Sequence, residues 1–143
     1  MNKRDVIDFL EQFNIEEDKI NKFFKDKYVI TINNNTFLTK KNFQKNQVYG
    51  DTLLFIQLKK HIPSKFLLDF IKKHTNLVEI TTDKQALNFT YGKNIKIQSV
   101  KYRNFKENQL YIVTYQDEIL GFARFENKEF INLMNIGEYL QEN

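Results

Sequence analysis

The sequence predicts a mixed α+β fold in two halves, an α/β half followed by a smaller, mostly-β half. In residues 1–80, stretches with helical spacing of apolar residues alternate with β-branched and aromatic stretches. In residues 81–143, one short helical segment precedes several short strands with polar turns between them, a pattern that favours a closed barrel. With 143 residues, 41% hydrophobic and 15% aromatic, the chain has enough apolar material to exclude intrinsic disorder.

The first half opens with two amphipathic helices and a hairpin. Apolar residues with helical spacing mark the helices: Val6, Phe9, Leu10 and Phe13, then Ile20, Phe23 and Phe24. Tyr28–Ile32 and Thr36–Thr39 are predicted as paired strands because they are rich in β-branched and aromatic residues. Asn33–Asn35 is predicted as their turn, since asparagine tolerates positive φ.

The remainder of the first half is predicted to end in a helix. Lys40–Gln47 is expected as a short surface helix, Gly50–Asp51 as a turn and Leu53–Leu58 as a buried strand. Pro63 stands at a favourable first-turn position for the final helix, and Lys72–His74 complement its dipole. The buried face of this helix is expected to consist of Phe66, Leu67, Phe70 and Ile71.

A domain junction is expected near Val78–Thr82. Thr82 and Gln85 match a capping box, which predicts a short helix over Asp83–Asn88. Gln116–Glu118 is predicted as a tight connection between strands, and Ile136–Leu140 as a closing helical turn. The expected strands are Phe89–Tyr91, Ile95–Val100, Leu110–Tyr115, Ile119–Phe125 and Phe130–Leu133.

The charge pattern indicates a binding function. The chain carries 22 Lys and Arg against 18 Asp and Glu, and residues 93–106 contain bases without an acid. Bases interleaved with aromatic residues are typical of RNA-binding surfaces, which need cations for phosphates and flat faces for unstacked bases. The alternative is an amphipathic strand whose solvent face is lysine because of an A/T-rich coding sequence. The residues predicted to contact phosphates are Lys93, Lys96, Lys101 and Arg103.

Catalysis, cofactors and membrane insertion are not expected. The absence of Cys excludes disulfides and thiolate metal sites, and no Gly-rich phosphate-binding motif occurs. His61 and His74 each follow a pair of lysines, so both are expected on solvated surfaces, without the spacing of a metal site. Gly121 and Gly137 are expected to be structural. A polar N-terminus without a long apolar run predicts an intracellular protein.

The second half resembles a PUA domain, a small RNA-binding barrel, and the whole chain resembles the pre-PUA plus PUA ribosome-assembly factors of archaea and eukaryotes. Residues 83–94, 110–113, 119–123 and the ending Asn135–Leu140 carry the resemblance. It implies a pre-PUA domain over residues 1–80, a PUA-like RNA-binding domain over residues 81–143, and a role in large-subunit assembly and pre-rRNA processing. The RNA-binding residues that it implies are Lys84, Lys93, Lys96, Lys101, Arg103, Arg124 and Lys128.

The expected partners are ribosomal RNA or a pre-ribosomal particle, together with ribosome-assembly proteins that bind the first half; no small-molecule substrate is expected. The resemblance implies a cytoplasmic location in an archaeon and a nucleolar or nuclear one in a eukaryote. The family's basic strand before its closing signature is here Lys128 with Glu129, Asn132 and Met134. Two alternatives therefore stay open: a protein-interaction scaffold with a degenerate PUA domain, and an accessory RNA-binding subunit of an RNA-modifying enzyme.

Overall fold

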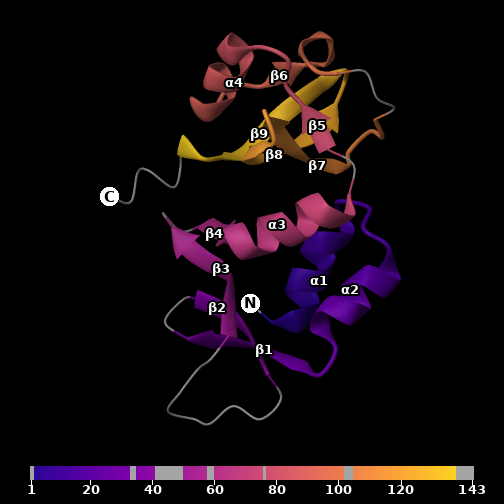
Figure 1. Cartoon of the computed structure of the whole chain (residues 1–143), viewed down its shortest axis with the longest axis vertical. Coiled ribbons are helices and arrows are strands. Elements are labelled where there is room, and N and C mark those ends of the chain that lie inside the picture. Colours follow the sequence, from indigo (N-terminus) through magenta and orange to yellow (C-terminus); the bar gives the residue numbers. More distant parts are fainter. Residues whose placement is uncertain are drawn as a thin grey trace. The chain divides into compact units, whose positions relative to one another are not determined.

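The structure, a computed structural model, describes residues 2–32, 35–40, 50–57, 60–75, 77–101 and 105–137. The chain forms two compact units, residues 1–74 and residues 75–143, which we call the first and second units (Figure 1). The division falls a few residues before the junction expected near Val78–Thr82. The reason is that Leu77–Glu79 is a strand, β5, that pairs in parallel with a strand of the second unit.

The first unit contains an antiparallel four-stranded sheet in the order β1-β2-β3-β4. Its strands are β1 (Lys27–Ile32), β2 (Asn35–Lys40), β3 (Gly50–Gln57) and β4 (Lys60–Pro63). The predicted hairpin of β1 and β2 is confirmed, with Val29 opposite Leu38. The expected turn at Asn33–Asn35 and helix at Lys40–Gln47 fall largely on residues outside the described part of the chain, although Asn35 and Lys40 themselves belong to β2.

Three helices complete the part of the first unit that the structure describes: α1 (Lys3–Glu11), α2 (Glu17–Phe24) and α3 (Lys65–His74). A capping box begins α1, in which the Asn2 side chain accepts a hydrogen bond from Asp5 N at 3.0 Å and Asp5 returns the contact. The predicted apolar stripes are buried, with Val6 and Leu10 on α1 and Ile20 on α2 almost inaccessible to solvent. In Figure 1, α1 packs against α2 and β1, whereas α3 packs along β3 and β4.

The structure corrects three expectations in the first unit. Gly50 and Asp51 are not a turn but the start of β3, because Gly50 pairs with Thr39 of β2. Pro63 ends β4, a strand that the sequence did not predict, and the side chain of Ser64 caps α3 by accepting a hydrogen bond from Leu67 N at 3.1 Å. The buried face of α3 consists of Leu67, Leu68 and Ile71. Phe66 is instead 37% exposed, and its ring lies 5.8 Å from the ring of Phe23.

The second unit contains a curled five-stranded sheet in the order β5-β7-β8-β9-β6. Only β5 and β7 are parallel, and the other pairs are antiparallel. The remaining strands are β6 (Ile95–Lys96), β7 (Leu110–Tyr115), β8 (Glu118–Glu126) and β9 (Glu129–Asn135). The predicted strands at Leu110–Tyr115, Ile119–Phe125 and Phe130–Leu133 are thus confirmed, and the tight turn before β8 has positive φ at Gln116 and Asp117.

Backbone contacts join the two edges of this sheet beyond β5 and β6. They are an isolated bridge between Ile80 and Val100, and hydrogen bonds from Thr81 N to Ser99 O (3.3 Å) and from Lys101 N to Glu79 O (3.0 Å). The ladder itself is not continuous there, because a 3₁₀ turn, η1 (Ile97–Ser99), follows β6. The sheet is therefore a curled half-barrel whose edges meet at one place, instead of the fully closed barrel that the strand count favoured.

One helix, α4 (Asp83–Thr90), covers this half-barrel and contacts β8 and β9. The side chain of Thr82 accepts a hydrogen bond from Gln85 N at 3.3 Å, which is the first of the two contacts of the predicted capping box. The helix that the box predicted is confirmed. The helix extends through Thr90, so the strand expected at Phe89–Tyr91 is wrong. Phe89 is fully buried, and this tertiary packing lets the helix continue past the point at which its local pattern changes.

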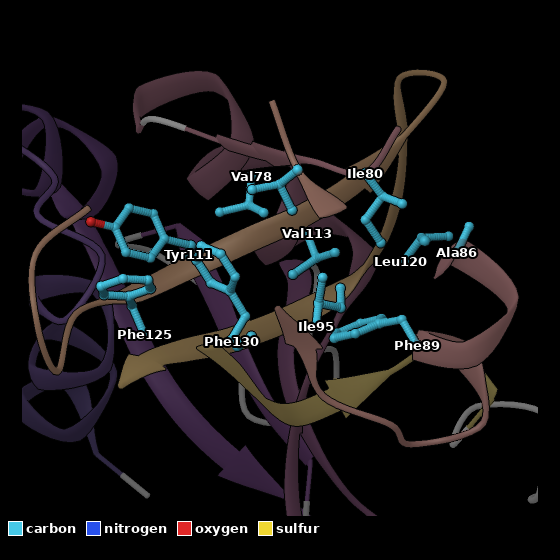
Figure 2. Packing of buried hydrophobic residues seen from close by; sticks show 12 residues of the cluster. Val78, Ile80, Ala86, Phe89, Ile95, Tyr111, Val113, Leu120, Phe125 and Phe130 are labelled. Carbon is cyan, nitrogen blue, oxygen red and sulfur yellow. The ribbon is translucent and has the colours of Figure 1, made fainter. Parts of the chain in front are cut away.

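The core of the second unit lies between α4 and the inner face of the curled sheet (Figure 2). Figure 2 shows Tyr111, Phe125 and Phe130 gathered at one end and Ala86 and Leu120 at the other. The Phe130 ring centroid lies 5.0 Å from that of Phe125 and 6.1 Å from that of Tyr111. Burial of a large side chain of this kind stabilises a fold by about 1.5–3 kcal/mol.

The strand expected over Ile95–Val100 is correct only for Ile95 and Lys96, since η1 replaces Ile97–Ser99 and Val100 forms only an isolated bridge with Ile80. The closing turn expected at Ile136–Leu140 extends beyond Gly137, the last residue that the structure describes. None of the helices in the described part of the chain combines the length and the apolar character that crossing a lipid bilayer requires.

Candidate nucleic-acid interface

Three of the candidate lysines lie along one edge of the second unit's sheet. Lys96 belongs to β6 and pairs with Glu129 of β9. The backbone N–H of Ile97 donates to the carbonyl oxygen of Lys128 at 3.1 Å, which brings the β8–β9 turn beside the end of β6. Lys93 precedes β6 on the same edge, and all three lysines are exposed. We call Lys93, Lys96 and Lys128 the edge lysines.

The side chain of Asn132 fixes the Lys93 end of this edge. Its Nδ2 donates to the carbonyl oxygens of Phe89 at 2.7 Å and Lys93 at 3.1 Å. Its backbone N–H donates to Asn94 Oδ1 at 2.8 Å, so both the backbone of Lys93 and the side chain of Asn94 are bound to Asn132 of β9. Asn132 and Glu129 are three residues apart on β9, which separates the backbone positions beside Lys93 and Lys96 by about 10 Å. This row of cations suits an extended polyanion.

The edge lysines are not neutralised by neighbouring acids within the part of the chain that the structure describes. No carboxylate there lies within ion-pair distance of Lys93, Lys96 or Lys128. Glu129 stands opposite Lys96 in the register and is half-buried, so its charge weakens this edge toward phosphate.

An exposed aromatic ring accompanies the lysines. Tyr91 is 74% exposed at the end of α4, two residues before Lys93. An unstacked RNA base needs such a flat face, and a neighbouring ammonium group can meet the adjoining phosphate. The edge therefore combines the two kinds of contact that single-stranded RNA requires.

The other candidates lie elsewhere in the second unit. Lys84 is exposed on the first turn of α4. Lys101 is beside β5, where its Nζ lies 3.3 Å from Glu79 Oε2. Arg124 is on β8 between two inward-facing core residues and thus points away from the core, with its guanidinium 3.7 Å from Glu126. Arg103 lies outside the described residues. The structure thus brings together three of the predicted residues and separates three others.

The sequence did not single out the positioning role of Asn132. In the sequence, Asn132 was noted only because the resembled family has basic residues in this strand. Its partners Asn94 and Phe89 are 38 and 43 residues away, so no local pattern could reveal them. Asn135 extends the contact, since its Nδ2 donates to Asn132 Oδ1 at 3.3 Å and its own Oδ1 accepts from Gly137 N at 2.9 Å.

Two titratable groups in the described part of the chain, His74 and Tyr115, have pKa values that depart from the ordinary ones. The ring of His74 lies 4.8 Å from that of Phe70. Desolvation, with the nearby charges of Lys19 and Lys73, lowers the pKa of His74 below its ordinary value. The side chain of His61 is outside the described set. Among the side chains that the structure describes, no three His, Asp or Glu groups gather as metal ligands would.

The hydroxyl of Tyr115 has a raised pKa, and measuring it tests a contact between β7 and α4 of the second unit. Its OH donates a hydrogen bond to Asp83 Oδ1, and the pKa of Tyr115 rises above its ordinary value of 10.0, chiefly because of this bond. We expect Asp83→Asn to lower the pKa of this tyrosine toward the ordinary value, because the charged acceptor that holds the proton is lost. Spectrophotometric titration of the phenolate, with Tyr115→Phe identifying the signal, measures the change. An identical titration curve in Asp83→Asn would contradict the contact.

No protein-family model matches the chain, and no curated protein matches it.

Proposed function

We propose that this chain is a noncatalytic RNA-binding factor that acts in large ribosomal subunit assembly and pre-rRNA processing. The observation that carries the proposal is the row of edge lysines beside the exposed ring of Tyr91. The resemblance of residues 83–94, 110–113, 119–123 and 135–140 to PUA domains supports the choice of ribosomal RNA as the ligand. The proposed location follows from the same resemblance: cytoplasmic in an archaeon, nucleolar or nuclear in a eukaryote.

The edge suits recognition of a backbone and one or more unpaired bases. The backbone that carries Lys93 and Lys96 is tied to β9, so the cations are presented from a fixed edge while their side chains adapt to the phosphates. Each neutralised phosphate releases counterions, which makes binding strongly dependent on salt. The ring of Tyr91 would then stack on a base and add affinity that salt does not remove.

Neutralising the edge is expected to flatten the salt dependence of binding. The triple variant Lys93→Gln, Lys96→Gln and Lys128→Gln removes three phosphate contacts at about 0.7–0.9 units each in the slope of log K against log salt. We therefore expect a slope smaller by about 2–3 units. Fluorescence anisotropy of a labelled ribosomal RNA fragment across a salt series measures it.

The matched control is the triple variant Lys19→Gln, Lys65→Gln and Lys73→Gln, which makes the same change of charge at exposed positions of the first unit. We expect this control variant to keep the slope of log K against log salt to within about one unit of the wild type, because it loses only the general attraction between the protein and RNA. Equal slopes for the wild type and the edge variant, both folded by thermal melting, would remove this edge from the RNA surface.

A protein-interaction scaffold is the second candidate function. Ion pairs already engage Lys101 with Glu79 and Arg124 with Glu126, and Glu129 lies within the proposed interface. The second unit holds 8 Lys and Arg against 9 Asp and Glu, a net charge of −1, which does not itself attract RNA. Salt-independent binding to an assembly protein, without measurable binding to ribosomal RNA, would favour the scaffold.

A further inference from the structure

The first unit contains a lysine-lined groove that the sequence did not indicate. It has a volume of about 780 Å³ and lies among α1, α2 and β1. Among the described residues, four lysines from three elements and a turn line it together with a single acid, Asp26. The lysines are Lys3, Lys22, Lys25 and Lys27.

Aromatic rings hold two of these lysines at the groove. Lys3 Nζ lies 5.5 Å from the ring centroid of Phe24, and Lys27 Nζ lies 6.0 Å from that of Phe23. A ring face attracts a cation without neutralising its charge, so the ammonium groups remain able to bind an anion. Among the described residues, none of the four lysines is paired with a carboxylate.

The net charge of the whole first unit also favours an anionic ligand. Residues 1–74 hold 14 Lys and Arg against 9 Asp and Glu, a net charge of +5, whereas residues 75–143 have a net charge of −1. Within the groove, four bases oppose one acid. A concave site with one sign of charge raises the local concentration of an oppositely charged ligand. The charge of the groove therefore favours an anionic ligand, and its volume of about 780 Å³ can hold a ligand larger than a single ion.

The aromatic lining favours a nucleic acid over an acidic peptide. Tyr28 is 45% exposed and lines the groove next to Lys27. Single-stranded nucleic acids bind in positively charged grooves that follow the backbone, with aromatic side chains on which the bases stack. An acidic peptide would use the lysines but has no general use for an exposed ring beside them.

We propose that this groove is a second contact for single-stranded RNA, with its lysines binding phosphates and Tyr28 stacking on a base. The inference rests on the proposed RNA-binding function and deepens it. It assigns RNA contact to the first unit as well, where the sequence had indicated a protein partner.

The test uses the full chain and a fluorescent oligouridylate as the probe. The double variant Lys22→Gln and Lys25→Gln removes two cations that make no cation–π contact, and glutamine has almost the helix propensity of lysine. We expect the slope of log K against log salt to fall by about 1.4 units, from two single-strand phosphate contacts. The matched control is Lys65→Gln with Lys73→Gln, the same charge change on exposed positions of the same unit.

Tyr28→Leu supplies an independent measure of stacking. It is expected to weaken oligouridylate binding about tenfold, within the range for loss of one stacked base, while leaving the salt slope unchanged. Thermal melting of each variant shows that the first unit remains folded. Unchanged binding in both Tyr28→Leu and the double lysine variant would overturn the proposal.

The outcomes also separate this inference from the proposed function. If the edge variant loses its salt slope and the groove variant behaves as its control, the groove proposal fails and the ribosomal RNA function stands. If only the groove variant loses its slope, the groove proposal stands and the edge assignment fails. A labelled polyglutamate that binds through Lys22 and Lys25, with oligouridylate not bound, would overturn the RNA assignment and identify an acidic-peptide site.

Discussion

Replacing Gly121 with alanine is expected to unfold or severely destabilise the second unit. A Cβ at this position would lie 1.9 Å from the carbonyl oxygen of Met134 and 2.7 Å from the Cα of Asn135, far inside any tolerable contact. Gly121 also has φ of +149°, which L-residues rarely adopt. Because the obstacle is backbone, β8 and β9 would have to separate where Gly121 pairs with Asn135, next to the register shift between Phe122 and Ala123. We expect a loss of about 4 kcal/mol or more in the free energy of unfolding.

Denaturant titration and thermal melting followed by circular dichroism measure this loss. A loss of about 4 kcal/mol corresponds to a fall of about 15–30 °C in Tm for a domain of this size. The matched control is Gly92→Ala, since Gly92 also has positive φ, +91°, but no atom lies within 4 Å of the added Cβ. Its cost is expected to be only the backbone strain of about 1–2 kcal/mol. Similar melting temperatures for the two variants would show that position 121 does not require glycine because of close packing.

The elements with strong local patterns were predicted correctly from the sequence. The first two helices follow from the apolar spacing of Val6 and Leu10 and of Ile20 and Phe24, which are buried as expected. The central strands β7, β8 and β9 follow from long β-branched and aromatic stretches between polar turns. In these segments the local pattern and the tertiary packing specify the same structure.

The elements that were missed or wrong depend on distant partners. The strands β4 and β5 have four and three residues, too few to show alternation, and they exist because β3 and β7 pair with them. In Ile95–Val100 the alternation of apolar and polar residues predicted a strand. Ile97 instead donates to Lys128 and Val100 pairs with Ile80, so the backbone turns between two partners. Exposure still alternates there, with Lys96 exposed and Ile95 buried, although the backbone is not a continuous strand.

The candidate interface was predictable in part for the same reason. The exposure of Lys93 and Lys96 is a local property, and it could be predicted from the sequence. The grouping of these residues with Lys128 depends on the pairing of β6 with β9, which no sequence pattern specified. The groove lysines of the first unit were missed because Lys3 and Lys27 come from different elements and share a surface only after folding.

Replacing Asn132 with leucine is expected to destabilise the second unit and weaken RNA binding together. Leucine has nearly the same shape, but it removes the donors to the carbonyl oxygens of Phe89 and Lys93 and the acceptor for Asn135. At about 1 kcal/mol for each hydrogen bond, the expected loss in unfolding free energy is about 2–3 kcal/mol. Released from β9, Lys93 would also bind phosphate with a larger entropic cost, so affinity for ribosomal RNA should fall severalfold without a large change of salt slope.

Replacing Asn132 with aspartate separates hydrogen bonding from packing. The new carboxylate keeps an acceptor for Asn135 but places negative charge against the oxygens of Phe89 and Lys93. We expect a loss of stability at neutral pH at least as large as that of Asn132→Leu, and a smaller loss in acid. The sign follows because the surrounding oxygens raise the carboxyl pKa in the folded state, and the protonated form can donate one hydrogen bond. Denaturant titrations at neutral and acidic pH measure the difference. If Asn132→Asp is as stable as the wild type at neutral pH, these carbonyl groups do not depend on the Asn132 amide, and the edge that carries Lys93 is held by the strand pairing alone.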